Sequence, residues 1–260
     1  MKSGGWIAPH YDPARERAWH LSMLVARDVC SWCAHDAATG EAAALRWSPG
    51  GAALNADDLP GSPTAATFVT LPEWGALVPD AALAPGAEAD HLRLVHGGLP
   101  TGAMRTEPFG RLGATCVYVH DDEAERQVLD RFPSARPLPL LTLMASAALA
   151  RAEQGPMLLL HRSHDRLDAA AADRGRLLLC TTYPARSSQD TLYFALLAAE
   201  GAAMLPSTAR LRYGGTHLTP HEEGLLKRFF ADAEPAATAP SAEVPAHRWL
   251  ALLEQFACAS

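Results

Sequence analysis

The chain has 260 residues, 48% of them hydrophobic and 20% charged, which is typical of a globular protein large enough for one big domain or two lobes. Its formal net charge of −7, with no block of lysine and arginine, argues against a nucleic-acid-binding surface. No apolar run reaches the roughly 18 residues of a membrane span, and the N-terminus lacks the apolar core of a secretory signal, so we expect a cytoplasmic protein without a transmembrane segment.

The first half of the chain begins with β-like sequence. Residues 1–17, with Trp6 and Tyr11, are predicted to be an N-terminal tail. Three strands are predicted next, and Thr39-Gly40 is the turn between the second and third. Their ranges are 20–26, 29–35 and 41–47. Further β-like sequence is predicted at 66–71, 76–83, 91–97 and 102–109.

A buried strand at 114–120 leads into the first predicted helix. Asp121 supplies the N-cap of this helix, and the acidic residues that follow it suit the helix dipole. The apolar face of the helix is Val128, Leu129 and Phe132. An alanine-rich helix over about 140–153 then carries the chain into its second half.

The second half begins with strands in the same manner as the first. The ranges 156–162, 165–173 and 176–183 form a predicted three-strand meander. Ser187 and Asp190 resemble a capping box at the start of a helix, and 209–215 is the next strand.

The last part of the chain is predicted to contain two helices. Thr219, Pro220 and Glu222 mark the start of the first. A weak strand is predicted near Val244. A final amphipathic helix is predicted from four apolar residues, Trp249, Leu250, Leu253 and Phe256.

The three-strand opening occurs twice, separated by about half of the chain, which indicates an internal duplication. We therefore predict an α/β (α+β) protein with two lobes, each a mixed sheet flanked by helices. The first lobe is predicted to span 18–138, with an inserted β-rich segment over about 66–113. The second lobe is predicted to span 139–260.

This duplicated plan resembles the actin-like ATPase superfamily, whose members pair two ribonuclease-H-like lobes. A more specific likeness covers nearly all of residues 18–230 and is carried by three stretches: "FVTLPEWGALVPDAAL", "TCVYVHDDEAERQVLDRFP" and "MLLLHRSHDRLDAAAADRGRLLLCTTYPARSSQDTLYFALLAAE". These stretches resemble a bacterial domain-of-unknown-function family of that clan, DUF3822. More distantly the chain resembles PilM and GspL, which use this fold as a scaffold in membrane complexes. The resemblance implies a protein partner, and actin-like folds often self-associate.

The resemblance also implies where ATP and Mg²⁺ would bind. Actin-like ATPases hold phosphates with two hairpin turns, each usually containing Asp-x-Gly, because glycine lets backbone amides approach the phosphates. Here the two turns fall at Asp28 and Asp165, and neither has a glycine beside it. This argues against ATP hydrolysis, so we predict no catalytic residue.

A glycine pair beside the adenosine is the third element of those ATPases, and the stretch "YGGT" resembles it. Gly214, Gly215, Thr216 and Asp28 are therefore the candidate nucleotide-binding residues, and Arg210 and Arg212 could reach a phosphate. Under this hypothesis Gly215→Arg abolishes nucleotide binding and leaves the fold intact. The alternative is a plain turn, for which two glycines after a strand are common.

Two further patterns suggest other chemistry. Cys30 and Cys33 have the C-x-x-C spacing of a redox or metal pair, but they fall in a predicted strand, where residues three apart point to opposite faces. His161, His164 and Asp165 suggest a metal site, which the neighbouring arginines disfavour. We predict neither a disulfide nor a metal site.

The sequence therefore favours a non-catalytic actin-like scaffold that binds another protein. The alternative is an ATP-binding protein or weak ATPase that uses the glycine pair and Asp28. A third hypothesis, a thiol-redox protein, requires a cysteine of low pKa at Cys30 or Cys33.

Overall fold

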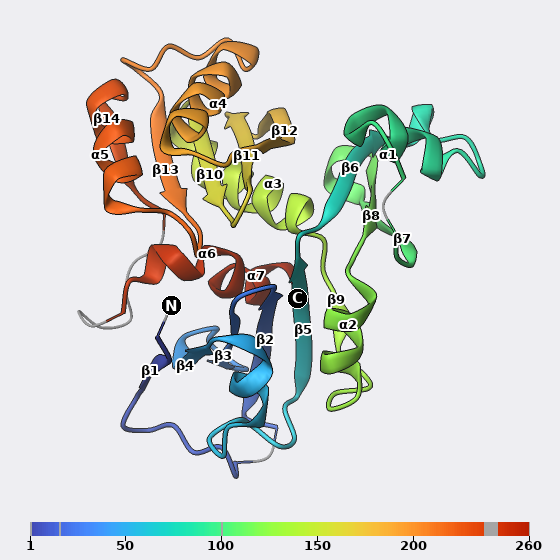
Figure 1. The fold of residues 1–260 in the computed structure, drawn as a ribbon, viewed down its shortest axis with the longest axis vertical. Coiled ribbons are helices and arrows are strands. Elements are labelled where there is room, and N and C mark those ends of the chain that lie inside the picture. Colours follow the sequence, from blue (N-terminus) through green and yellow to red (C-terminus); the bar gives the residue numbers. More distant parts are fainter. Residues whose placement is uncertain (1, 16, 100, 237–243, 260) are drawn as a thin grey trace. The chain divides into compact units, whose positions relative to one another are not determined.

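The protein is described by a computed structural model that covers residues 2–15, 17–99, 101–236 and 244–259 (Figure 1). The chain forms two compact units. The first unit contains Met1–Leu140, Pro240–Val244 and Ala251–Ser260. The second contains Leu141–Ala239 and Pro245–Leu250.

The main sheet of the first unit has six strands in the order β1-β4-β3-β2-β5-β9. Strands β2, β3 and β4 form an antiparallel meander, β5 lies parallel to β2, and β9 lies parallel to β5. The strands are β1 (Gly4–Ile7), β2 (Trp19–Ala26), β3 (Cys30–Asp36), β4 (Ala42–Ser48), β5 (Ala65–Leu71) and β9 (Arg136–Pro137). Helix α2 (Asp122–Leu129) packs on this sheet through Val128, in a core that includes Trp19, Trp32 and Phe68.

A smaller three-stranded sheet, ordered β6-β8-β7, also lies in the first unit. Its elements are β6 (Trp74–Pro79), α1 (Glu88–His96), β7 (Met104–Phe109) and β8 (Ala114–Val119). Leu92 of α1 packs against Val117 and Val119 in a small separate core. The inserted segment predicted over about 66–113 therefore has different bounds. Strand β5 belongs to the main sheet and lies outside the insertion, and β8 belongs to the small sheet and lies inside it.

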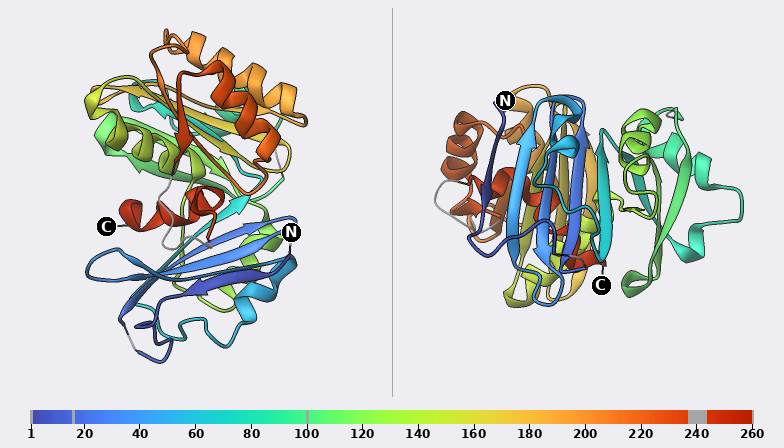
Figure 2. Two further views of the ribbon diagram at one scale, coloured as in Figure 1. Left: turned by 90° about the vertical axis from the view of Figure 1, so that its left-hand side faces the viewer. Right: turned by 90° about the horizontal axis from the view of Figure 1, so that it is seen from below.

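The sheet of the second unit has five strands in the order β12-β11-β10-β13-β14. Helices α4 and α5 cover one face, where Ala195, Ala198 and Leu226 pack against Leu158 and Leu160. The strands are β10 (Met157–Arg162), β11 (Arg166–Asp173), β12 (Arg176–Pro184), β13 (Arg210–Gly214) and β14 (Asp232–Pro235). The helices are α3 (Leu140–Arg151), α4 (Ser188–Gly201) and α5 (Pro220–Phe229), and Figure 2 shows the same elements from two further sides.

The two sheets repeat one topology. In each, three antiparallel strands are followed by a fourth strand that runs parallel to the first, so β4-β3-β2-β5 corresponds to β12-β11-β10-β13. This is the duplicated ribonuclease-H-like plan, and the predicted α/β fold with two such lobes is confirmed.

The predicted helix starts are correct because each rests on a local hydrogen bond. Asp121 accepts from the amides of Glu123 and Ala124. Reciprocal capping boxes join Ser187 to Asp190 at α4, and Thr219 to Glu222 at α5. Within the described part of the chain, no helix combines the length and apolar composition needed to cross a bilayer.

Residues 91–97, predicted as β-like, instead lie in helix α1 and its C-cap. Acidic residues stand in its first turn, Arg93 and His96 in its last, and Gly97 ends it in the left-handed conformation with φ 73°. Only Leu92 of this helix is buried, so the helix lacks the apolar stripe that marks most helices in a sequence. Similarly, the strand predicted over 76–83 ends at Pro79, where a 3₁₀ turn begins.

The first 17 residues are not a simple tail. Strand β1 pairs antiparallel with β4, in the register Trp6 opposite Leu45. Tyr11 lies in the core and donates its hydroxyl hydrogen to the Asp58 carbonyl oxygen at 2.6 Å. The apolar and aromatic side chains of this segment therefore complete the first unit.

The end of the chain also differs from the prediction. Val244 itself is not in a strand, the residues 237–243 before it lie outside the described structure, and β14 occurs earlier, at Asp232–Pro235. The single final helix is instead three short pieces: a 3₁₀ turn η5 (Ala246–Trp249), α6 (Leu250–Leu253) and α7 (Gln255–Ala259). The last ten residues belong to the first unit rather than to the second lobe.

Polar contacts hold these last residues on the six-stranded main sheet of the first unit. Gln255 donates to the Met23 carbonyl oxygen at 2.8 Å and accepts from the Thr67 hydroxyl at 2.9 Å. The Phe256 ring stacks on His35. A side chain at Gly40 would lie 2.5 Å from this ring, so glycine is needed there.

Candidate functional site

The glycine pair lies at the end of strand β13. Gly214 is the last residue of the strand, and Gly215 turns the chain away with φ 115°, a conformation that favours glycine. The Gly215 amide donates a hydrogen bond to the His247 carbonyl oxygen at 2.9 Å. A neighbouring amide, that of His217, donates to the Arg162 carbonyl oxygen at 3.2 Å.

Other parts of the chain fill the space where side chains would stand at these glycines. A Cβ atom at Gly214 would collide with the His247 carbonyl and lie 3.0 Å from the Leu250 Cβ. A Cβ atom at Gly215 would collide with the backbone of Arg162. Glycine is therefore required at both positions by contacts within the second unit, and Gly215→Arg cannot leave the fold intact as the sequence had suggested.

The polar neighbours of the glycine pair have structural partners. Thr216 is buried, and its hydroxyl lies 3.0 Å from His217 Nδ1. Arg212 pairs with Asp232 at 2.7 Å. Arg210, at the opposite end of β13, donates to backbone carbonyl oxygens, including that of Gly155. Both guanidinium groups thus hold the β13 region together.

Asp28 lies at the tip of the β2–β3 turn and is exposed. The turn is closed by the Ala26 amide, which donates to the Val29 carbonyl oxygen at 2.8 Å. Asp28 belongs to the first unit, whereas Gly214, Gly215 and Thr216 belong to the second.

The second hairpin turn, between β10 and β11, is anchored by a buried arginine. Arg162 is 5% exposed, and its Nε donates to Thr191 Oγ1 at 3.1 Å and to Glu222 Oε1 at 3.2 Å. The guanidinium also donates to the carbonyl oxygens of Ser163 and Arg166 within the turn. The side chain of Arg162 therefore ties the turn to helices α4 and α5.

Glu222 is the charge partner in this network and is 2% exposed. Burial alone would raise its pKa, but hydrogen bonds from Thr191 and Thr219 and the charge of Arg162 bring the pKa below its ordinary value. Glu222 also completes the α5 capping box. Sequence reasoning recognised the cap but missed the ion pair, because the pairing with Arg162 is non-local.

The residues suggested as a metal site are not brought together. His161 is buried and its Nδ1 lies 3.4 Å from Asp168, which accepts from the Thr182 hydroxyl at 2.7 Å. His164 instead lies beside His217, with ring centroids 5.2 Å apart. In the described ranges, no three His, Cys, Asp or Glu side chains are grouped closely enough to hold a metal ion.

Cys30 and Cys33 lie on opposite faces of β3, as their strand spacing predicts. Cys30 packs in the main core of the first unit with Trp32, and Cys33 is not part of that core. Both thiols are buried, and burial raises the pKa of Cys30 to about 12 and that of Cys33 also upward. Such thiols are poor nucleophiles, because the thiolate is the reactive form.

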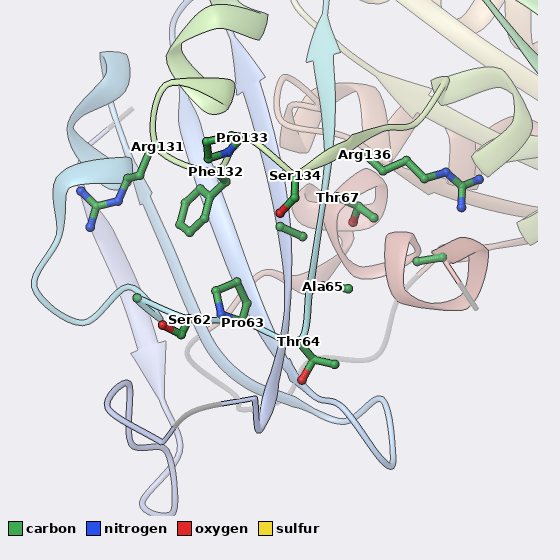
Figure 3. Close-up of a pocket in the computed structure, with 13 residues that line it drawn as sticks. Ser62, Pro63, Thr64, Ala65, Thr67, Arg131, Phe132, Pro133, Ser134 and Arg136 are labelled. Carbon is green, nitrogen blue, oxygen red and sulfur yellow. The ribbon is translucent and has the colours of Figure 1, made fainter.

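A groove that the sequence did not indicate lies at the outer edge of β5 (Figure 3). Its volume is about 450 Å³. Strand β9 pairs with β5 only at Thr67 and Phe68, so Ala65 and Ala66 have no strand beside them on this edge in the described structure. The other wall is the segment from Arg131 to Ser134.

An arginine stands at each end of the groove, and most of the side chains between them are polar or small. Its described lining includes two arginines and no carboxylate. Figure 3 shows Phe132 inside the groove, and Arg131 and Arg136 extending to opposite sides of it. Arg136 pairs with Glu107, and Arg131 lies over the Phe132 ring, 5.9 Å from its centroid. No sequence pattern marks this groove, because its walls come from distant segments.

Residues 74–227 match the sequence profile of the family described as "Protein of unknown function (DUF3822)". The chain belongs to the DUF3822 family. The match begins at β6 and ends in α5, so it contains the three-stranded sheet and most of the second unit of this DUF3822 protein. No curated protein matches the sequence.

Solved structures match over almost the whole length of the DUF3822 chain. A Bacteroides thetaiotaomicron protein, described as having an actin-like ATPase fold and unknown function, aligns with TM-score 0.76 and 14% identity, covering 94% of this chain and 97% of its own. The ethanolamine utilization protein EutJ from Carboxydothermus hydrogenoformans aligns with TM-score 0.51 and 11% identity, covering 96% and 92%. A chain of the PilM-PilN type IV pilus biogenesis complex aligns with TM-score 0.49 and 11% identity, covering 93% and 98%. The likeness to the Bacteroides thetaiotaomicron protein, whose fold is described as actin-like ATPase, establishes that fold for this chain.

Proposed function

We propose that this DUF3822 protein is a non-catalytic scaffold of the actin-like fold that binds a partner protein. The observation that carries the proposal is the closure of the glycine pair by the chain itself. The Gly215 amide is bonded to His247, and the backbone of Arg162 fills the space where a Gly215 side chain would stand. Because the backbone at Gly215 is already bonded to and packed against other parts of the chain, its amide is not available to bind a nucleotide.

The two hairpin turns support the same proposal. A phosphate-binding turn needs backbone amides that can converge on an anion, which glycine permits. The turn at Asp28 has valine next, and Arg166 follows Asp165. In the second turn, the Ser163 amide already donates to the Arg166 carbonyl oxygen at 3.0 Å. These features favour the interpretation that both hairpin turns stabilise the fold and do not bind phosphate.

The basic groove is the surface that we propose for the partner. An extended segment could pair with the open edge of β5 at Ala65 and Ala66, in the manner of strand addition. Arg131 at one end of the groove would favour a carboxylate in that segment, whereas Arg136 at the other end is already paired with Glu107. We therefore propose an extended, acidic segment of another protein as the occupant.

Nucleotide binding is tested by thermal unfolding of the purified protein with and without millimolar Mg-ATP, together with an ATPase assay. The scaffold proposal expects no saturable rise in Tm and no turnover. A saturable rise in Tm would favour the ATP-binding alternative. Turnover that disappears in Asp28→Ala would overturn the proposal.

The groove is tested with a photo-cross-linking residue in place of Ser134, and with the same residue in place of exposed Gln154 as the control. A partner captured only from Ser134 is then purified, and its affinity is measured by calorimetry. We expect Arg131→Glu to weaken that binding by about tenfold or more, and exposed Arg111→Glu to have no effect. Equal loss in both variants, or capture from both positions, would remove the groove as the partner site.

A further inference from the structure

Strand β12 is the outer strand of the five-stranded sheet in the second unit. It pairs with β11 on one side, and no strand of the described chain pairs with its other side. At nine residues it is the longest strand of the unit, with an edge of roughly 30 Å. Such an edge presents a row of backbone donors and acceptors that another strand can use.

The composition of β12 leaves this edge unprotected. Edge strands are usually blunted by charged residues or proline. The opposite edge strand, β14, carries Asp232, Glu234 and Pro235 in four residues. Between Leu177 and Tyr183, in contrast, β12 has neither a charge nor a proline.

Apolar side chains flank the same edge. The Tyr183 ring stacks on Phe194 of α4, with centroids 4.9 Å apart. Tyr193, next on the helix, contacts Phe194 edge-on and is 61% exposed. Leu178 is 38% exposed. A partner strand on β12 would cover part of this aromatic and aliphatic surface.

We propose that β12 pairs antiparallel with β12 of a second copy of this chain, about a two-fold axis at Thr181. The register of β12 on β11 is irregular near Leu178, where β12 has an extra residue, and regular from Leu179 to Tyr183. The axis at Thr181 keeps the pairing inside this regular part. The two five-stranded sheets then form one continuous sheet.

The residues brought together in this register are complementary. Leu179 lies opposite Tyr183 of the other copy on the α4 face, an aliphatic–aromatic pair that stabilises antiparallel sheets. Cys180 lies opposite Thr182, and Thr181 meets its own counterpart. No charges oppose one another in this regular part. A strongly charged foreign strand would leave its charges without partners here, so a second copy fits this edge better.

Sedimentation velocity of the full-length protein tests the pairing. We expect a dimer at micromolar concentration, and we expect Thr181→Lys to raise the dimer Kd more than about tenfold, because two lysines would face each other across the axis. Gln154→Lys is the control, since it adds the same charge to the same unit away from β12. Circular dichroism and Tm establish that both variants remain folded.

Disulfide cross-linking at position 181 tests the proposed β12–β12 register directly. With Cys180 and Cys258 replaced by serine, Thr181→Cys should form a disulfide-linked dimer under mild oxidation, and Gln154→Cys should not. A wild-type protein that stays monomeric at the highest soluble concentration would overturn the proposal. So would a dimer that Thr181→Lys leaves unchanged, or equal cross-linking from both cysteine positions.

Discussion

The backbone amide of Gly215 donates to the carbonyl oxygen of His247 at 2.9 Å, and so the residue that follows β13 is bonded to the 3₁₀ turn near the end of the chain. The glycine pair resembles a nucleotide contact in sequence. In the structure it is the point at which the backbone of the pair packs closely against the backbone of Arg162 and of His247, and we call this contact the crossing. His247 Nε2 also lies 3.2 Å from Glu223 of α5, so the turn is held from two sides.

Gly215→Ala is predicted to destabilise the second unit by about 2 kcal/mol or more, because the new Cβ collides with Arg162 and φ is 115°. Urea unfolding measures this change in free energy. Gly224→Ala is the matched control, since Gly224 lies inside helix α5 with open space at its Cβ position. Alanine at 224 should stabilise the protein by up to about 1 kcal/mol. Equal effects of the two substitutions would contradict the crossing.

Glu222→Gln is predicted to destabilise the protein by about 3–5 kcal/mol, because it leaves the buried guanidinium of Arg162 without its charge partner. The double variant Arg162→Met with Glu222→Leu should recover part of this loss, since it removes both charges together but also removes the α5 cap and the bonds to the turn carbonyl oxygens. Chemical denaturation of the three proteins gives the comparison. A single variant as stable as wild type would show that the ion pair has no such role.

Acid should weaken the first unit through His35, which is 2% exposed. Burial lowers its pKa from 6.5 to about 4, so the unfolded chain binds more protons between these values. Stability from this group is complete above pH 6.5 and falls as the pH drops towards 4, by at most about 3 kcal/mol. The neighbouring His20 also has a pKa lowered by burial and adds to the same trend.

Unfolding free energies measured between pH 7 and pH 4 test this dependence. The variant His35→Gln, which is polar and does not titrate, should show a flatter profile than wild type. Exposed His164→Gln should follow wild type. Parallel profiles for wild type and His35→Gln would contradict the assignment to His35.

Alkylation should distinguish the buried cysteines, which are Cys30, Cys33 and Cys116, from the half-buried ones. Cys30 and Cys33 should resist iodoacetamide in the folded protein at pH 8, because burial raises their pKa values. Cys180 and Cys258 are half-buried and should react first. Mass spectrometry of peptides after timed labelling gives the rates. Rapid reaction at Cys30 or Cys33 would revive the thiol-redox hypothesis.

Much of the fold could be predicted from the sequence because its causes are local. Apolar runs mark the repeated meanders, and capping boxes such as Thr219 with Glu222 mark helix starts. Helix α1 was missed because a single residue, Leu92, is buried in it. Strand β1 was missed because it depends on pairing with β4.

The surroundings of the candidate site could not be predicted. The glycine pair was recognised, but its neighbours Arg162 and His247 lie far away along the chain. A sequence pattern shows that glycine is needed and does not show which group approaches it. The same holds for the groove, whose walls meet only after β5 and β9 have paired.

Amide hydrogen exchange at Gly215, with and without millimolar Mg-ATP, tests the central claim most directly. The account predicts an amide protected in the free protein, because it is bonded to His247, and a rate that Mg-ATP leaves unchanged. Fast exchange in the free protein would show that the crossing does not form. Protection gained only on addition of Mg-ATP would show that Gly215 faces a nucleotide, and would contradict the proposed scaffold.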